Sequence, residues 1–120
     1  MDLNTFYKAL LSISDVKWVI IYKNGDEIIN ANIDSDSVNL IIKFMNSVIK
    51  SAESALNRIL SAHDQISFLT IYLQSGLALL FVRYEDYNLI VTIRASKIQY
   101  LNETKQMVER VKKLLEGARD

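Results

Sequence analysis

The sequence predicts an α+β domain in which a five-stranded antiparallel sheet is covered by helices on both faces, in the order αββαβββα. Three observations lead to this prediction: helical apolar periodicity in three segments, five apolar stretches of strand length, and turn signals between consecutive strands. The chain has 120 residues, of which 50% are hydrophobic, so it can bury a core of its own. We therefore predict a single domain over residues 1–120.

The beginning of the chain predicts a helix followed by a hairpin. Residues 3–11 carry apolar side chains at the spacing of a one-faced helix. Residues 16–22 are mostly β-branched or aromatic and indicate a buried strand. The Asn24-Gly25 pair predicts a type I′ turn, because both residues tolerate the positive φ that this turn requires. Residues 27–31 form the returning strand.

A long helix is predicted next, ending at about Leu60. Asp34 and Asp36 mark its start, because their side-chain oxygens can accept the free N–H groups of a first turn. Its apolar side chains fill an arc of about 160°, whereas one core contact needs about 100°. The opposite face is predicted to be solvated and carries Asn39, Lys43, Asn46, Lys50, Ser54 and Asn57. The surplus apolar surface indicates a second contact outside the domain's own core.

The second half of the chain predicts three strands in succession, over residues 65–74, 77–84 and 87–94, and then a helix. Short connections between the strands indicate an antiparallel meander. The final helix is predicted to open at Asn102 and to stop at Gly117. We expect the long helix to cover one face of the sheet and the other two helices to cover the opposite face.

The strand predicted at residues 65–74 is expected to lie at an edge of the sheet. Ile66, Phe68, Thr70 and Tyr72 are predicted to share one of its faces. It contains no proline, glycine or lysine, which are the usual protections of an exposed edge. Two such edges can pair across a two-fold axis, so the pattern indicates a homodimer.

Composition excludes several classes of function. The formal net charge is zero, which argues against a nucleic-acid partner, since such proteins usually carry a clustered basic excess. There is no cysteine, which excludes disulfides, thiolate metal sites and cysteine nucleophiles. The beginning of the chain lacks the features of a signal peptide, and no apolar run is long enough to insert into a membrane. We therefore predict a cytoplasmic protein.

No set of side chains predicts a reaction. His63 and Asp64 could support base chemistry, but no nucleophile is placed beside them, and a polar loop explains them better. The acidic residues around Asp34 lack the glycine and the terminal glutamate of a calcium loop. The three glycines are isolated, so no phosphate-binding loop is present. We predict no enzyme activity, no catalytic residue, no metal site and no cofactor.

Arginines and aromatic residues also invite functional interpretations. Arg58, Arg83 and Arg94 could serve as arginine fingers for a partner that hydrolyses a nucleotide, although surface or sheet-face arginines are the simpler interpretation. Trp18 and the tyrosines could line a ligand pocket, but in apolar strands such residues are more often part of a core or an interface.

The layout resembles the roadblock/dynein light-chain domains, which are relatives of longin domains, and its strand and helix order is also similar to profilin. The resemblance covers residues 3–117. Its most specific part is the helix at residues 6–11 followed by the link, apolar strand, polar residues and turn glycine of residues 13–25. Residues 87–93 resemble the final strand of the family.

The resemblance implies a homodimer, or a heterodimer with a sibling chain, that scaffolds or regulates a Ras-like small GTPase without catalysing a reaction. The dimer elements of the family are the third strand and the long helix. They fall here on Ile66, Phe68 and Thr70 in the strand, and on Leu40, Phe44, Ser47, Val48, Ser51 and Ala55 in the helix. The small helix residues would let two helices approach closely.

Two alternative functions remain open at this point. A profilin-like or PAS-like domain would bind a small ligand in a pocket between helices and sheet. A purely structural light-chain subunit would hold a larger complex together without a regulatory effect. Neither alternative is separated from the GTPase adaptor by the residues alone.

Overall fold

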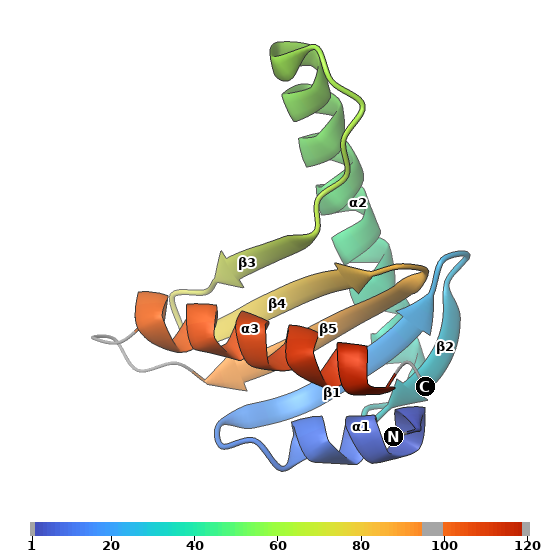
Figure 1. The fold of residues 1–120 in the computed structure, drawn as a ribbon, viewed down its shortest axis with the longest axis vertical. Coiled ribbons are helices and arrows are strands. Elements are labelled where there is room, and N and C mark those ends of the chain that lie inside the picture. Colours follow the sequence, from blue (N-terminus) through green and yellow to red (C-terminus); the bar gives the residue numbers. More distant parts are fainter. Residues whose placement is uncertain (1, 95–99, 119–120) are drawn as a thin grey trace.

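A computed structural model describes residues 2–94 and 100–118, and its elements follow the predicted order (Figure 1). The elements are α1 (Leu3–Leu11), β1 (Val16–Lys23), β2 (Glu27–Ala31), α2 (Ser35–Leu60), β3 (Phe68–Tyr72), β4 (Leu77–Tyr84), β5 (Tyr87–Arg94) and α3 (Tyr100–Ala118). All neighbouring strands are antiparallel, in the spatial order β2-β1-β5-β4-β3. The α+β prediction is therefore confirmed, and β3 is an edge strand as expected.

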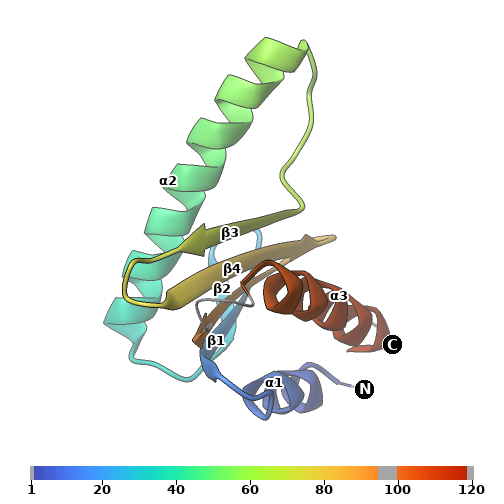
Figure 2. The same ribbon diagram turned by 90° about the vertical axis from the view of Figure 1, so that its left-hand side faces the viewer.

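Helices cover both faces of the sheet, which creates two apolar cores (Figure 2). α1 and α3 lie on one face, where Phe6 and Leu10 of α1 and Val111 of α3 pack against the strands. α2 lies on the other face, with four buried residues at helical spacing, Val38, Ile42, Met45 and Ile49. β1, β4 and β5 are buried from both sides, which explains their consecutive apolar residues.

The first hairpin turn differs from the predicted type I′ turn at Asn24-Gly25. Lys23 pairs with Glu27, so the loop has three residues, and the positive φ angles fall on Gly25 (88°) and Asp26 (66°). Asn24 is instead engaged with the neighbouring hairpin. Its N–H donates to the Asp86 carbonyl at 3.0 Å and its Oδ1 accepts from Asn88 at 3.0 Å. Contacts between the two hairpins therefore override the local turn preference.

Two other boundaries also differ from the prediction. α3 begins at Tyr100 rather than Asn102, and Gly117 lies in its last turn instead of stopping it. Glycine has no Cβ, so its backbone can take helical as well as left-handed angles. β3 covers only Phe68–Tyr72 of the predicted 65–74 strand.

The start of α2 is capped as the sequence predicts. Asp34 is the N-cap, and its carboxylate accepts hydrogen bonds from the Ser37 N–H at 2.9 Å and from the Ser37 hydroxyl at 2.8 Å. These bonds favour the charged form and hold the pKa of the Asp34 carboxyl below its ordinary value. Asp36 lies in the first turn, where a negative charge interacts favourably with the helix dipole.

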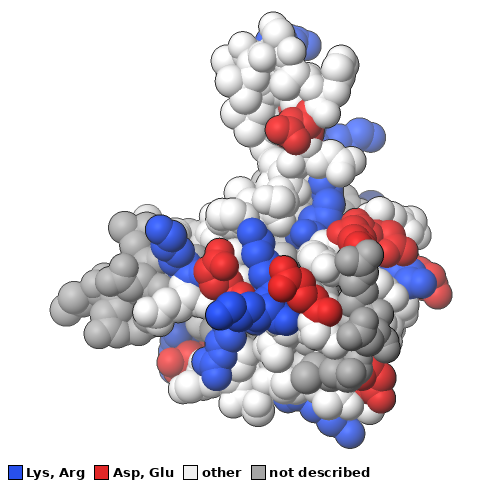
Figure 3. All heavy atoms as spheres, in the orientation of Figure 1, with Lys and Arg blue, Asp and Glu red and all other residues white. Residues whose placement is uncertain are grey.

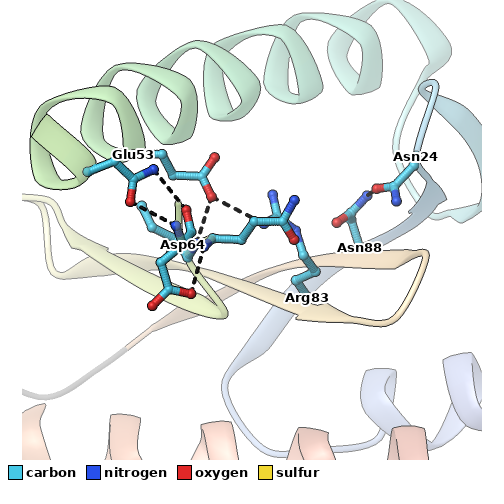
Figure 4. A network of polar contacts seen from close by, with 8 residues as sticks. Asn24, Glu53, Asp64, Arg83 and Asn88 are labelled. Carbon is cyan, nitrogen blue, oxygen red and sulfur yellow. Dashed lines mark hydrogen bonds and ion pairs between the residues drawn. The ribbon is translucent and has the colours of Figure 1, made fainter. Parts of the chain in front are cut away.

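Hydrogen bonds from α2 hold the connection between this helix and β3, residues 61–67 (Figure 4). The Asn57 side chain accepts from the Asp64 N–H at 2.9 Å and donates to the Asp64 carbonyl at 3.0 Å. Glu53 Oε2 accepts from the Ile66 N–H at 2.7 Å and also lies 3.3 Å from Arg83 Nη1 of β4. Because the backbone of this segment bonds to α2, β3 is shorter than predicted.

The face of α2 that was predicted to be solvated is therefore partly engaged. Besides Asn57, Asn46 is half-buried and donates to Asp26 at 2.8 Å, and it accepts a longer bond of 3.4 Å from the Tyr22 hydroxyl. Burial of Tyr22 raises its pKa to about 12. The polar spacing of these asparagines predicted that they face solvent. Instead, Asn46 bonds to the first hairpin turn and Asn57 bonds to the connection before β3, and the helical pattern alone does not predict where these segments lie.

We expect Asp34→Ala to lower the melting temperature at neutral pH. The folded-state pKa of Asp34 is depressed, so its contribution is present above the ordinary aspartate value of 3.8 and is lost as the pH falls through the folded-state pKa. The difference between the variant and the unaltered chain should therefore shrink in strong acid. Thermal melts followed by circular dichroism from neutral to acid pH measure it. Asp34→Asn is the control, because it keeps a capping oxygen but cannot titrate.

Asn57→Ala should release residues 61–67 from α2. Two side-chain hydrogen bonds to the Asp64 backbone are lost, which we expect to cost about 1 kcal/mol of unfolding free energy. Asn39→Ala is the matched control, because Asn39 is an exposed asparagine of the same helix. Both substitutions replace asparagine by alanine, so both raise the intrinsic helix propensity by the same amount. Denaturant melts and exchange of the Asp64 amide hydrogen measure the effect. If Asn57→Ala and Asn39→Ala are equally stable and the Asp64 amide hydrogen exchanges at an unchanged rate, the Asn57 side chain does not hold residues 61–67 against α2.

Candidate protein interface

One flank of α2 exposes apolar and small side chains to solvent. Leu40 is 69% exposed and Phe44 is 50% exposed, although both are large apolar residues. Ser47, Ser51 and Ala55 continue the same flank and are also exposed, and Val48 is half-buried beside them. These six residues, which we call the α2 flank, are separate from the buried stripe that packs on the sheet. Large apolar side chains exposed together on one flank of a helix are typical of an interaction site.

The last turns of α2 extend beyond the edge of the sheet. Figures 1 and 2 show the end of the helix projecting past β3, and we call residues 54–60 the α2 overhang. Leu56 and Leu60 follow Ile49 by seven and eleven residues, so they continue the stripe that packs on the sheet. With no strand of the described chain beneath it, Leu60 is 66% exposed, and Ile59 is 76% exposed.

The edge strand β3 presents backbone groups as well as side chains. Arg83 N donates to the Ser67 carbonyl at 2.8 Å, and Leu73 N donates to the Leu77 carbonyl at 2.8 Å. In an antiparallel pair the direction of these groups alternates from residue to residue. The N–H and C=O groups of Phe68, Thr70 and Tyr72 therefore point away from β4, toward the outer edge.

The two faces of β3 have different surroundings. Leu69 and Ile71 pack against the core beneath α2. Phe68 and Thr70 lie opposite Val82 and Leu80, which belong to the core beneath α1 and α3. Phe68 is 49% exposed, and its ring lies 5.1 Å from Lys112 Nζ of α3. This distance is within the range of a cation–π contact, which orients an otherwise exposed ring.

The structure places most of the predicted interface residues together, but it separates Ile66 from Phe68 and Thr70 of β3. The α2 residues do form one exposed flank, and Phe68 and Thr70 share a face of β3. Ile66 does not join them. It precedes the strand and packs on the α2 side, because its N–H is held by Glu53. The participation of all nine residues in a dimer remains a prediction.

Other exposed apolar residues in α2 and in and just after β3 were not included in the predicted interface, namely Leu56, Ile59, Leu60, Tyr72 and Leu73. The exposure of the three α2 residues could have been predicted from the length of the helix. A 26-residue helix is about 39 Å long at 1.5 Å per residue, whereas five strands at about 4.8 Å span about 20 Å from edge to edge. A helix crossing such a sheet must project beyond it, so its last apolar residues lie outside the domain's core.

On the face shown in Figure 3, charge is distributed differently over α3 and over the projecting end of α2. Lysine, arginine and glutamate alternate over α3, while the projecting end of α2 is mostly uncharged. Arg83 and Glu53 form an ion pair beneath α2. Arg58 and Arg94 are exposed. The uncharged end of α2 favours burial against another apolar surface.

A depression of about 520 Å³ lies on the outer side of α3 and is lined by Lys105, Gln106, Glu109, Arg110 and Lys113. Ligand pockets are usually apolar clefts with a few converging polar groups. These lining residues are polar or charged side chains of one helix face, so they do not favour the small-ligand sensor. His63 is exposed in the connection to β3. None of the described helices is long and apolar enough to span a membrane.

Comparison with solved structures identifies the fold. A Roadblock/LC7 domain from Streptomyces avermitilis superposes with a TM-score of 0.67 at 16% sequence identity, covering 96% of this chain and 98% of that one. Myxococcus xanthus MglB gives a TM-score of 0.63 at 13% identity, covering 98% and 99% of the two chains. No protein-family model matches the sequence, and no curated protein sequence matches it significantly. The chain has the Roadblock/LC7 fold.

Proposed function

We propose that this chain is a non-enzymatic, dimeric adaptor that binds a Ras-like small GTPase and regulates or scaffolds it. The observation that carries the proposal is the exposed apolar surface formed by the α2 flank, the α2 overhang and β3. A domain of this size has a sufficient core without that surface. Exposed apolar area of this extent is costly unless a partner covers it.

A second copy of the chain fits this surface. If two β3 edges pair across a two-fold axis, one sheet runs through both subunits. Each α2 overhang then projects over the sheet of the other subunit, so that Leu56 and Leu60 meet apolar residues there. Along the two helices, Ser47, Ser51 and Ala55 have small side chains, which permit close approach of the helix backbones. The same geometry would serve a heterodimer with a sibling chain.

The GTPase assignment rests on the Roadblock/LC7 fold together with the resemblance to the roadblock family in residues 3–117. The mechanism we propose is surface recognition by the dimer. A bound protein shifts the switch equilibrium of a GTPase only by the difference between its affinities for the two states. A rigid platform that contacts a switch segment in one conformation supplies such a difference without contributing a reactive group.

Light scattering should report a dimer for the unaltered chain, and Phe44→Asp should weaken it. A central aromatic side chain at an interface often contributes about 2 kcal/mol or more, so we expect the dimer dissociation constant to rise by about 30-fold or more. Phe44 is half-exposed in the single chain, so the variant should fold normally. Asn39→Asp adds the same charge on the opposite side of α2 and should leave dimerisation unchanged. A monomeric unaltered chain would refute the dimer.

Binding to its GTPase should depend on the bound nucleotide. We expect an affinity difference of about tenfold or more between the GDP form and the form with a non-hydrolysable GTP analogue, because a tenfold difference corresponds to about 1.4 kcal/mol of bias. Isothermal titration of the dimer against purified Ras-like GTPases of the same organism measures it. Equal affinities would leave a structural subunit, and no binding to any of them would reject the GTPase assignment.

A further inference from the structure

We propose that Glu53 sets the register in which two β3 strands pair, with the two-fold axis passing through Thr70. This inference rests on the proposed homodimer and specifies its central contact. The occupant of the β3 edge is a second copy of the same strand, antiparallel to the first. Glu53 acts from α2 by occupying the backbone group that would otherwise extend the pairing edge.

The outer edge of β3 offers its backbone groups at every second residue. The bonds from Arg83 N to the Ser67 carbonyl and from Leu73 N to the Leu77 carbonyl fix this alternation. Phe68, Thr70 and Tyr72 therefore direct their N–H and C=O groups outward. Extended further along the chain, the same alternation would make Ile66 the next outward residue, and this is the position that Glu53 controls.

Glu53 ends the pairing edge on its N-terminal side. Its Oε2 accepts the Ile66 N–H at 2.7 Å, so this donor is not offered to another strand. The carboxylate is held in place by Arg83 Nη1 at 3.3 Å, and both side chains are 20% exposed. The guanidinium also lies 5.6 Å from the centroid of the Phe81 ring (Figure 4 shows Arg83 and Glu53 facing each other). Because Glu53 Oε2 already accepts the Ile66 N–H, an incoming strand cannot pair with this donor.

The turn into β4 ends the edge on the other side. Leu73 N is bonded to Leu77, and Gly76 N donates back to the Leu73 carbonyl at 3.1 Å, so the chain is already turning after Tyr72. The pairing edge is thus limited to Phe68–Tyr72, whose central residue is Thr70. Two strands of five residues overlap completely only when their central residues face each other. A shift in either direction leaves part of each edge uncovered.

Side chains favour the same register on both faces of the sheet. When Thr70 faces its copy, Phe68 faces Tyr72 of the second copy on the α3 side, and Leu69 faces Ile71 on the α2 side. Threonine pairs, aromatic pairs and apolar pairs are each favourable across antiparallel strands. In the register centred on Leu69, Phe68 would face Thr70 instead, and the aromatic pair would be lost.

Cysteine crosslinking can read the register, because the chain has no cysteine of its own. Single variants Leu69→Cys, Thr70→Cys and Ile71→Cys are oxidised at a concentration where light scattering detects the dimer. Residues on the two-fold axis lie about 5.5 Å apart between Cα atoms, within the range of a disulfide, whereas diagonal neighbours are about 7–8 Å apart. We expect the Thr70→Cys variant to crosslink at least about fivefold faster than the other two.

The role of Glu53 is tested in the same three cysteine backgrounds. Glu53→Ala frees the Ile66 N–H, so the edge can lengthen toward the N-terminus, and crosslinking through Leu69→Cys should rise several-fold while crosslinking through Thr70→Cys falls. Glu53→Gln is the matched variant, because its amide oxygen can still accept the Ile66 N–H, and the axis should stay at Thr70. Circular dichroism confirms folding. If Glu53→Ala does not fold, Glu53→Leu replaces it, since it also removes the acceptor of the Ile66 N–H while keeping most of the side-chain volume, and the same shift is expected.

The outcomes separate this inference from the proposed function. A monomeric unaltered chain overturns both the dimer and its register. A dimer that crosslinks fastest through Leu69→Cys or Ile71→Cys, or through none of the three, overturns the register while the dimer stands. If the dimer is centred on Thr70 and Glu53→Ala does not change the relative crosslinking rates, the strand ends alone select the register. This result overturns the role of Glu53.

Discussion

The length of α2 relative to the width of the sheet is the constraint on which the rest of the structure depends. Four buried residues from Val38 to Ile49 pack the helix on the sheet, and the helix then continues to Leu60 past the outer strand. The continuation places apolar residues where no described element of the chain covers them. It also carries Glu53 and Asn57 to the connection at residues 61–67, so one helix both creates the exposed surface and shapes the strand beside it.

The polar contacts of α2 decide how much of β3 is a strand. Residues 65–67 were predicted to begin the strand, yet Ile66 donates to the Glu53 carboxylate and Asp64 bonds to the Asn57 side chain. A charged acceptor forms a stronger hydrogen bond than a neutral carbonyl. The segment therefore follows the helix for several residues before it joins the sheet at Phe68. The edge available to a partner is set by contacts within a single chain.

Patterns within one element could be predicted from the sequence, and contacts between distant elements could not. The α2 stripe, the Asp34 cap and the exposed Leu40 and Phe44 all follow from helical spacing and local capping preferences. The three-residue loop at Gly25 and the loss of Ile66 from the strand follow from hydrogen bonds to groups far away in the chain. No periodicity encodes such bonds, because each depends on which turn or loop the fold places beside the residue.

The two edges of the sheet are protected unequally, and this difference favours a closed pair over a continuing polymer. At the β2 edge, a bulge interrupts the pairing of β2 with β1, at the point between Ile21 and Tyr22 of β1. Past the end of β2, the Asn32 side chain takes the place of a strand residue, accepting from Val19 N at 2.8 Å and donating to the Lys17 carbonyl at 3.3 Å. Irregular edges of this kind resist strand addition. β3 pairs with β4 without a bulge and is regular over its whole length. If two copies of the chain pair through β3 as proposed, the joined sheet presents only its irregular β2 edges.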